Sequence, residues 1–364
     1  SLNFGDFSKS EVNKFNLVLE QLEEAYVDSI NKDELIEKAV ANLLKELDPH
    51  SYYIKAKDLS AINEPMEGSF DGIGVEFNLL DDTILVVAPI SGGPSQRVGI
   101  QSGDKIVSVD GEIIAGTDLE NEDVFKLLRG KSGTKVTVGV LRRGEDNLID
   151  FEITRDKIPI YSVDVSYMID DETAYIKINR FAANTYEEFV SASEKLLNLG
   201  MKKLILDLRN NPGGYLGAAI NVANEFLEED LLIVYTQDRL SKRQEYYSNA
   251  RGLLLDIDAV VIIDEGSASA SEIVAGALQD NDKGTIVGRR SFGKGLVQTT
   301  LPLSFNAQIK VTTAKYYIPS GRCIQAIDYA KSREEGSAGT VPDSLRKAFK
   351  TTNGRIVLDG AGIE

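Results

Sequence analysis

Residues 260–273 read VVIIDEGSASASEI, and this stretch decides how the second half of the chain is expected to fold. Residues 259–263 are apolar throughout, which is typical of a buried β-strand. Serines and alanines follow, and helical spacing of apolar residues begins at Ser271. A strand that turns directly into a helix holds a hydroxyl at the helix N-terminus, where partial positive charge stabilises an oxyanion. A cap made by Ser269 or Ser271 is the plainer interpretation, because capping serines are far commoner than nucleophilic ones.

Strands and helices alternate on both sides of this stretch. The apolar spacing predicts helices at 186–199, 216–227 and 271–278, and strands at 173–178, 203–208, 231–236, 285–287 and 310–317. Strands that are apolar almost throughout and separated by helices indicate a sheet that is covered by helices. We therefore expect an α/β core over residues 158–364.

The first half of the chain has two other sequence patterns, one helical and one β-rich. Residues 10–48 have apolar positions at helical spacing with a polar turn at 28–33, so two amphipathic helices are expected in an N-terminal helical region, 1–67. Residues 68–157 carry short β-rich runs punctuated by glycine, with one helical segment at 121–128. This pattern predicts a compact, separate module between the helical region and the core.

Composition excludes several classes of protein. The chain has 364 residues, 27% of them charged, with a formal net charge of -17, and its basic residues are scattered rather than arranged in a stripe. Nucleic acid is therefore not an expected partner. Because Cys323 is the only cysteine, neither an internal disulfide nor a cysteine-based metal site is expected. No run of 18 apolar residues and no signal peptide pattern occurs, so no transmembrane segment is expected, and the chain's last residues suggest that the natural protein continues.

Two further glycine-containing junctions follow predicted strands. Residues 206–214 read LDLRNNPGG, where Gly213 and Gly214 allow backbone N–H groups to approach an anionic atom, although the same letters also suit a plain turn. Residues 291–298 read SFGKGLVQ, which places Lys294 between two glycines. The spacing of a phosphate-binding loop is absent, and a surface lysine is the plainer interpretation.

A serine hydroxyl needs a base that accepts its proton. His50 is the only histidine, and it sits in LDPHS at 47–51, where we interpret it as a structural or turn residue. Lysine or a carboxylate remains as the base. Lys294 could act near neutral pH only if its pKa fell by roughly three units from about 10.4, and burial in an apolar pocket has that effect.

The combination of GSASASEI at 266–273, FGKG at 292–295 and Gln298 resembles the C-terminal processing (tail-specific) peptidases. The interval between Ser269 and Lys294 is that family's spacing. The resemblance implies that Ser269 is the nucleophile, that Lys294 is its general base and that Gln298 orients the lysine. It also implies an oxyanion hole made by Gly213 or Gly214 together with the N–H of Ala270. No metal or organic cofactor is implied.

Residues 72–75, which are Gly72, Ile73, Gly74 and Val75, resemble the carboxylate-binding loop of a PDZ domain. Such a loop receives the terminal carboxylate of a peptide, which adds to the sheet edge as a strand. Two positions depart from the family pattern: Pro212 stands where another glycine is common, and Cys323 stands where a small polar residue is common. Arg129 could couple tail binding to the active site, although a helix cap is the plainer role.

The fold implied by the resemblance is mixed α/β, with an α/β protease core, a helical N-terminal arm and an inserted β-rich PDZ domain. The implied function is a serine endopeptidase that recognises the C-terminus of unfolded or tail-exposed polypeptides, exported to a periplasm or cell envelope and open to homo-oligomer formation. The alternatives are a catalytically silent PDZ-containing scaffold, and an acyl-CoA-type enzyme that uses the amides of Gly213 and Ala270 without a nucleophile. Intact Ser269, Lys294 and Gln298 favour the peptidase.

Overall fold

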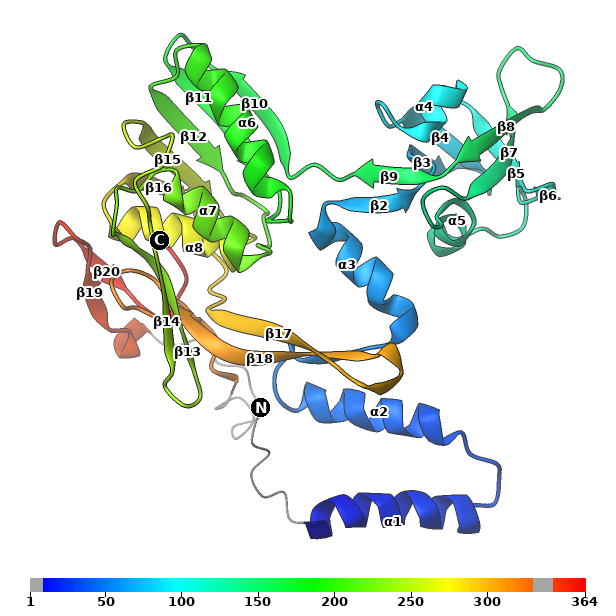
Figure 1. Ribbon diagram of the computed structural model, residues 1–364, viewed down its shortest axis with the longest axis horizontal. Coiled ribbons are helices and arrows are strands. Elements are labelled where there is room, and N and C mark those ends of the chain that lie inside the picture. The colour runs from blue at the N-terminus through cyan, green and yellow to red at the C-terminus, as the bar shows by residue number, and fades with distance from the viewer. Residues whose placement is uncertain (1–8, 330–342) are drawn as a thin grey trace.

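The structure is a computed structural model that describes residues 9–329 and 343–364 (Figure 1). It contains an α/β core, a helical N-terminal arm and an inserted β-rich module that stands away from the core. The mixed α/β fold expected from the sequence is confirmed. None of the helices within the described ranges is both long and apolar enough to cross a membrane.

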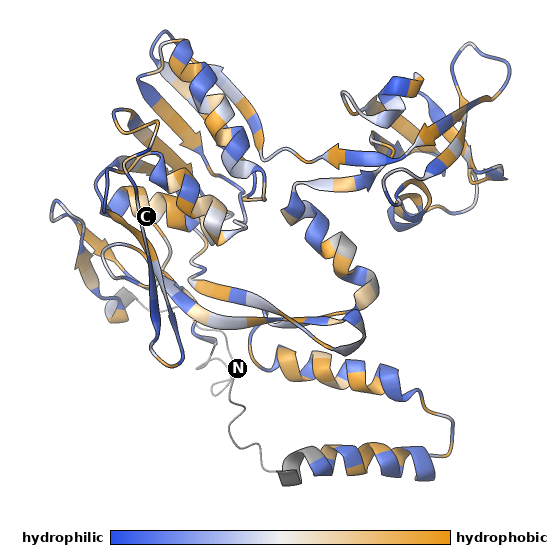
Figure 2. Cartoon of the chain, viewed as in Figure 1, coloured by the Kyte–Doolittle hydropathy of each residue, from blue (hydrophilic) through white to orange (hydrophobic). Residues whose placement is uncertain are grey.

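The core is built on a five-stranded sheet with the order β10-β11-β12-β15-β16. Its strands are β10 (Val163–Met168), β11 (Thr173–Ile178), β12 (Lys203–Asp207), β15 (Asp258–Ile263) and β16 (Gly284–Gly288). All are parallel except β10, which pairs with β11 in the antiparallel sense. Figure 2 shows apolar residues gathered on these strands. Because carboxyl ends of parallel strands meet at one edge, the loops after β12, β15 and β16 are brought together there.

Three helices pack on this sheet: α6 (Thr185–Asn198), α7 (Leu216–Asn224) and α8 (Ala270–Asp280). Every residue of α8 is buried. The helix can lie this deep because its residues are mostly apolar or small, and a Cβ on Gly276 would come within 2.9 Å of Ile318. The residue that begins α8 is therefore held on a fixed element.

A second, five-stranded sheet covers the site side of the core. It contains β1 (Tyr52–Ile54), β13 (Leu232–Asp238), β14 (Arg243–Tyr247), β17 (Leu296–Pro302) and β18 (Gln308–Tyr317), in the order β1-β18-β13-β14 with β17 on β18. Strand β1 pairs with β18 in the antiparallel sense, with Tyr52 opposite Lys310. The segment expected as an N-terminal helical region thus also contributes a strand to the second sheet. A three-residue strand is too short to show a period in the sequence.

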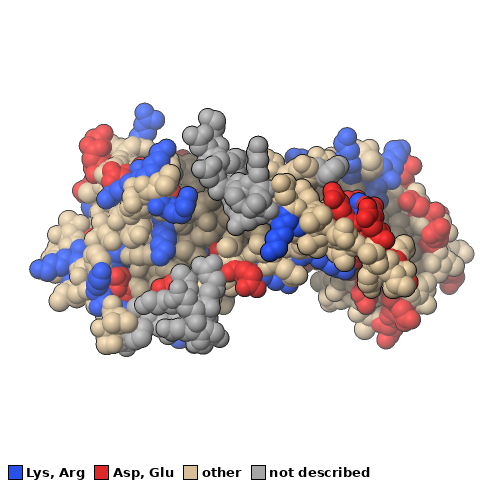
Figure 3. All heavy atoms as spheres, turned by 90° about the horizontal axis from the view of Figure 1, so that it is seen from below, with Lys and Arg blue, Asp and Glu red and all other residues tan. Residues whose placement is uncertain are grey.

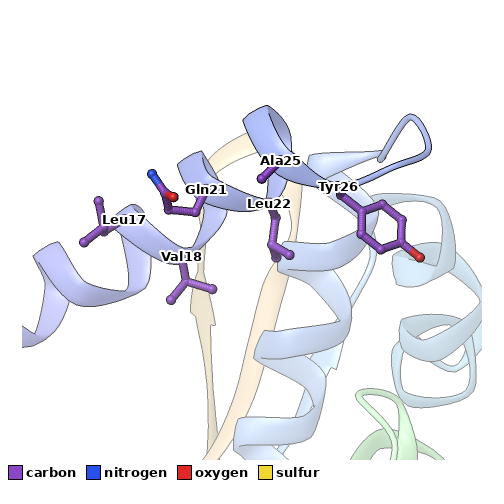
Figure 4. Close-up of a pocket in the computed structure, with 6 residues that line it drawn as sticks. All are labelled: Leu17, Val18, Gln21, Leu22, Ala25 and Tyr26. Carbon is purple, nitrogen blue, oxygen red and sulfur yellow. The ribbon is translucent and has the colours of Figure 1, made fainter.

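The N-terminal arm contains the two amphipathic helices expected, α1 (Lys9–Ala25) and α2 (Lys32–Lys45), and then a 3-10 turn (Ala56–Asp58) and α3 (Leu59–Glu67). Helix α2 begins where Asn31 accepts a hydrogen bond from the amide of Glu34, as an N-cap does. Figure 4 shows apolar side chains on one side of α1, which is exposed over most of its length. The residues that line this side are Leu17, Val18, Gln21, Leu22, Ala25 and Tyr26.

The inserted module has its own six-stranded sheet, which is antiparallel. Its elements are β3 (Val75–Leu79), β4 (Ile84–Pro89), α4 (Pro94–Val98), β5 (Lys105–Val109), β6 (Glu112–Ile113), α5 (Asn121–Leu128), β7 (Lys135–Leu141) and β8 (Ile149–Thr154). The module packs around a separate apolar core that includes Ile84, Ile106, Val138 and Ile153. Strands β2 (Ser69–Gly72) and β9 (Asp156–Pro159) form the ribbon that leads to it, and the expected boundaries at 68 and 157 fall at this ribbon.

The described C-terminal residues contain a 3-10 turn (Asp343–Leu345) and a hairpin of β19 (Ala348–Lys350) and β20 (Ile356–Leu358). A further 3-10 turn (Ser304–Asn306) lies between β17 and β18. Arg322 is buried and pairs with Asp280 at the end of α8, while its other guanidinium nitrogen donates to the carbonyl of Leu358. This arginine therefore fastens the hairpin to the core helix.

Candidate active site

Ser269 occupies the tight turn between β15 and α8. Its backbone has φ 55° and ψ -111°, a conformation that costs a non-glycine residue of order 1–3 kcal/mol. At this turn the Ser269 amide donates to Glu272 Oε2 at 2.8 Å, and the hydroxyl of Tyr316 lies 3.1 Å from the Ser269 carbonyl. Ser269 as a whole is half-buried.

Glu272 joins the serine turn to the lysine loop, a role that our sequence reasoning missed. Its buried carboxylate accepts hydrogen bonds from the amides of Ser269, Gly293 (2.7 Å) and Lys294 (2.9 Å), and from the hydroxyl of Ser291 (2.6 Å). Burial raises the pKa of Glu272 to about 7, although its four donors act in the opposite direction. The spacing Ser269-x-x-Glu272 is that of a capping box, which was the signal available in the sequence.

Tyr316 makes the second link between the two loops. Its hydroxyl lies 3.1 Å from the Ser269 carbonyl and 2.5 Å from the Lys294 carbonyl. The side chain is fully buried, and burial raises the pKa of Tyr316 well above its ordinary value, so the phenol stays a donor. One carboxylate and one hydroxyl thus bring the backbones of Ser269 and Lys294 together.

The Lys294 side chain is half-buried at the end of this loop. Burial is the largest cause that lowers the pKa of Lys294, and the positive charge of Lys310 lowers it further. The carboxylates of Asp48 and Glu272 act against this shift. The net direction is the one a general base requires. The backbones of Ser269 and Lys294 share Glu272 as their acceptor. In the part of the chain that the structure describes, no hydrogen bond joins Ser269 Oγ to Lys294 Nζ.

Gln298 lies on β17, directly opposite Thr312 on β18. Its Nε2 donates to Thr312 Oγ1 at 3.3 Å. The contact that the structure gives this amide is therefore to a threonine, and the expected contact with Lys294 stays a prediction.

The two glycines expected in the oxyanion hole lie next to the serine turn. A Cβ on Gly213 would come within 2.8 Å of both Ser269 Cβ and the amide of Ala270. However, the Gly213 amide donates to Asn211 Oδ1 at 2.9 Å, so it is already engaged. The hydrogen bonds found in residues 9–329 and 343–364 include none donated by the amides of Gly214 and Ala270. These two N–H groups are the better candidates.

Asn211 holds the glycine loop against the serine turn. Its carbonyl accepts hydrogen bonds from the amide of Ala268 and the hydroxyl of Ser271, each at 3.0 Å. Its side-chain Nδ2 donates to the carbonyl of Ile178 at 2.8 Å. Loops that follow three different strands are therefore joined through one buried asparagine.

His50 lies closer to the site than its position in the sequence suggests. Its amide donates to Asp48 Oδ1 at 2.8 Å, as in a turn, and its Nε2 lies 3.4 Å from the hydroxyl of Tyr329. Burial lowers the pKa of His50, and the charge of Lys294 contributes to the same direction. The histidine that we interpreted as a turn residue therefore makes turn contacts within electrostatic range of Lys294.

The expected peptide-binding loop, 72–75, lies between the ribbon and the first strand of the module. Strand β3 is the end strand of its sheet, so one of its edges pairs with no other strand in residues 9–329 and 343–364. Within the described part of the chain, no hydrogen bond is donated by the amides of Ile73 and Gly74. A small cavity of about 50 Å³ adjoins the loop, with mostly apolar walls formed by Phe70, Ile73, Val75, Phe77, Val124, Phe125 and Leu128.

Arg129 follows α5, and its amide donates to the carbonyl of Phe125 at the helix end. Its guanidinium carbon lies 4.8 Å from the ring centre of Phe70 and 4.6 Å from that of Phe125. The same side chain forms an ion pair with Glu64 on α3. Arg129 therefore contacts the module, the ribbon and the arm at once.

Charged side chains are mixed on the face of the molecule drawn in Figure 3, where lysines and arginines lie among acidic residues. Among the residues that the structure describes, no group of three or more His, Cys, Asp or Glu side chains has the arrangement of a metal site.

Family models match two parts of the chain. Residues 72–153 match a PDZ domain, and residues 172–332 match peptidase family S41. The PDZ match lies within the inserted module, and the peptidase match includes Ser269, Lys294 and Gln298.

Curated and solved relatives agree with these matches. The carboxy-terminal-processing protease of Bartonella bacilliformis is 38% identical over 319 residues, covering 86% of this chain and 72% of that protein. A probable CtpA-like serine protease of Staphylococcus aureus is 37% identical over 318 residues; the match covers 87% of this chain but only 63% of that protein. A solved photosystem II D1 C-terminal processing protease is 29% identical with a TM-score of 0.50, covering 87% of this chain and 91% of that one. The chain therefore belongs to peptidase family S41, among the carboxy-terminal-processing serine proteases.

Proposed function

We propose that this chain is an endopeptidase that captures the C-terminal tail of an unfolded or tail-exposed polypeptide and cleaves it with Ser269 and Lys294. One observation supports the proposal most strongly. Glu272 and Tyr316 each contact the backbones of both Ser269 and Lys294, which holds the serine turn next to the lysine loop. A scaffold that only bound peptides would need neither the strained Ser269 backbone nor a lysine with a lowered pKa.

In the proposed first step, neutral Lys294 takes the hydroxyl proton as Ser269 Oγ bonds to the carbonyl carbon of the scissile peptide. The C=O electron pair moves onto oxygen, and the resulting oxyanion is held by the N–H groups of Gly214 and Ala270. The C–N bond then breaks, and the ammonium of Lys294 gives its proton to the leaving amine. The product is an acyl ester on Ser269.

The second half of the reaction repeats this proton path with water. Lys294 takes a proton from water as the water oxygen bonds to the acyl carbon. The ester bond then breaks, and the proton returns to Ser269 Oγ. The amide of Gln298 orients the amine throughout, since its carbonyl oxygen is an acceptor suited to the Lys294 N–H groups.

Tail capture is assigned to the PDZ domain. The amides of Ile73 and Gly74 would receive the terminal carboxylate, and the peptide would add as a strand to the edge of β3. Support comes from that exposed edge and from the apolar cavity beside the loop. Because the cavity is small, a compact apolar C-terminal side chain fits it best.

The test uses the full chain and an unstructured polypeptide with a free C-terminus. Ser269→Ala and Lys294→Ala should each lower kcat by at least about 1,000-fold, as loss of a nucleophile or its base does in other serine proteases. Ser191→Ala and Lys195→Ala are matched controls, because both residues are exposed on α6, and they should retain full activity.

Undiminished cleavage by either site variant would show that the serine and lysine roles are wrong. Tail binding without cleavage by the unmodified chain, under any assay condition, would instead favour the peptide-binding scaffold. From the family resemblance we also propose that the protein acts in the periplasm or cell envelope, which fractionation of expressing cells tests.

A further inference from the structure

Ser51 lies at the end of the Asp48–Ser51 turn, between helix α2 and strand β1, and only 2% of its surface is exposed. Its hydroxyl donates to Asp48 Oδ2 at 2.9 Å and accepts a hydrogen bond from the amide of Thr312 at 3.1 Å. A buried hydroxyl that is both donor and acceptor has one favoured orientation. This residue therefore links the N-terminal arm to β18.

The amide of Thr312 needs such a partner because of a gap in the second sheet. Strand β17 pairs along one edge of β18. Along the other edge, strand β1 pairs with residues 308–310 and strand β13 pairs with residues 314–317. Neither strand reaches Thr312. The hydroxyl of Ser51 occupies the position that a backbone carbonyl of a neighbouring strand would otherwise take.

The other side of Thr312 leads to the proposed active site. Gln298 is its register partner on β17, and Thr312 Oγ1 accepts from Gln298 Nε2 at 3.3 Å. A register shift between Val297 and Gln298 lies at this point, and such irregularities re-aim side chains. Asp48, Ser51, Thr312 and Gln298 thus form a continuous hydrogen-bonded chain from the arm to a residue four positions after Lys294.

This chain has a chemical consequence for Gln298. One N–H of its NH2 group donates to Thr312 Oγ1, and no hydrogen bond to its carbonyl oxygen Oε1 is found in the described residues, so Oε1 is available as an acceptor. An acceptor is what a lysine amine or ammonium requires, because Lys294 has only N–H donors to offer in its charged form. The opposite amide orientation would present N–H donors to an N–H donor. Ser51 holds the backbone of Thr312, and the Thr312 hydroxyl in turn contacts the Gln298 amide, so the two residues together fix where this amide lies.

The Asp48–Ser51 turn also lies within electrostatic range of Lys294. Lys294 is under the influence of Lys310 on β18, Glu272 on α8, and Asp48 and His50 on the turn itself. Asp48 therefore acts on the site in two ways, through its charge and through its hydrogen bond to Ser51.

We infer that Ser51 is a positioning residue of this protease, which fixes the amide of Gln298 through Thr312 and so aligns Lys294 with Ser269. The inference rests on the proposed function. It makes the segment that follows the helical arm a working part of the catalytic centre, in addition to a strand of the sheet.

The test is a mutant cycle on the full chain, with kcat and KM measured separately on an unstructured polypeptide. Ser51→Ala and Thr312→Val should each lower kcat by about 10- to 100-fold, with KM changed by less than about twofold. Ser51→Thr keeps the hydroxyl and should recover most of the activity. In a Gln298→Ala background, Ser51→Ala should cause no further loss, because both changes break the same chain.

Additive losses in the double variant, or an unchanged kcat for Ser51→Ala, would overturn the inference. If Ser51→Ala fails to fold, Ser51→Cys replaces it in both backgrounds, because a thiol is close in volume but a weak acceptor for the Thr312 amide. Full activity of Ser269→Ala in the same assay would overturn the proposed function itself. The two failures are therefore distinguishable.

Discussion

The carboxylate of Glu272 accepts hydrogen bonds from the amides of Ser269, Gly293 and Lys294 although it is fully buried. Four donors use the full acceptor capacity of an ionised carboxylate, whereas a protonated carboxyl gives up one acceptor position to its own O–H. Burial acts against ionisation and raises the pKa of Glu272 to about 7. The geometry of the serine turn and the lysine loop therefore depends on a group that titrates near neutral pH.

Glu272→Gln should abolish most activity, with a loss of at least about 100-fold in kcat, because the amide presents N–H donors to backbone N–H groups. Stability should respond differently to pH in the two proteins. The pKa of Glu272 is raised in the folded state, so the unmodified chain loses stability as pH rises from about 4.5 to about 7. Denaturant unfolding at several pH values should show this slope only in the unmodified chain, and equal slopes would contradict the assignment.

Gly213 fits against Ser269 only because it lacks a side chain. Gly213→Ala is unfavourable for two reasons. Residue 213 has a φ of 93°, which a non-glycine residue rarely adopts, and the new Cβ would lie 2.8 Å from both Ser269 Cβ and the Ala270 amide. We expect kcat to fall by at least about 100-fold, since the serine turn must shift. Gly217→Ala is the control: it lies inside α7 with no atom near the new Cβ, and it should keep activity and raise the melting temperature slightly. Equal activity of the two variants would show that the close approach is unimportant.

At the scale of elements, the sequence predicted the apolar strands and the helices of the core, but it did not predict the exposed strands β10 and β14. Strands β10 and β14 are mostly exposed, so their residues carry little apolar signal. The site divides in the same way. Ser269, Lys294 and Gln298 lie in motifs that a resemblance can identify. The hydrogen bonds of Asn211 to Ser271 and Ile178, and of Gln298 to Thr312, depend instead on tertiary contacts.

The loop before β3 carries the prediction for tail capture. Gly74 has φ 74°, and a Cβ there would lie 2.9 Å from Ile158. Gly74→Ala should therefore weaken binding of a peptide with a free C-terminal carboxylate by about tenfold or more. Gly92→Ala is matched in φ, at 72°, but has open space around the new Cβ, so any cost there is backbone strain alone. Titration of a fluorescent peptide checks this, and a C-terminally amidated peptide should bind neither form well.

At the scale of the whole molecule, the PDZ domain is joined to the core by the β2–β9 ribbon and stands apart from it in Figure 1. The hydrophobic clusters of the two units are separate. A unit with its own core is expected to fold alone. The arm, in contrast, places β1 in the second sheet of the protease unit and the Asp48–Ser51 turn beside Lys294.

Residues 68–160 produced alone should accordingly unfold in one cooperative transition and should bind a peptide with a free C-terminus. The remaining core should lose activity on tailed substrates through a higher KM. Denaturant unfolding followed by circular dichroism checks the first part. A non-cooperative transition would show that the domain depends on the arm or the core.

The central claim is that Lys294 is neutral when Ser269 attacks. Its protonation can be followed directly by isotope-edited NMR of the lysine side chain, with Lys294→Arg used to assign the signal. We predict that Lys294 titrates below the ordinary lysine value of about 10.4, and that kcat/KM rises over the same pH range as Lys294 loses its proton. The claim would be contradicted if Lys294 stayed charged until the pH reached about 10.4 while the protein already cleaved its substrate at the full rate at lower pH.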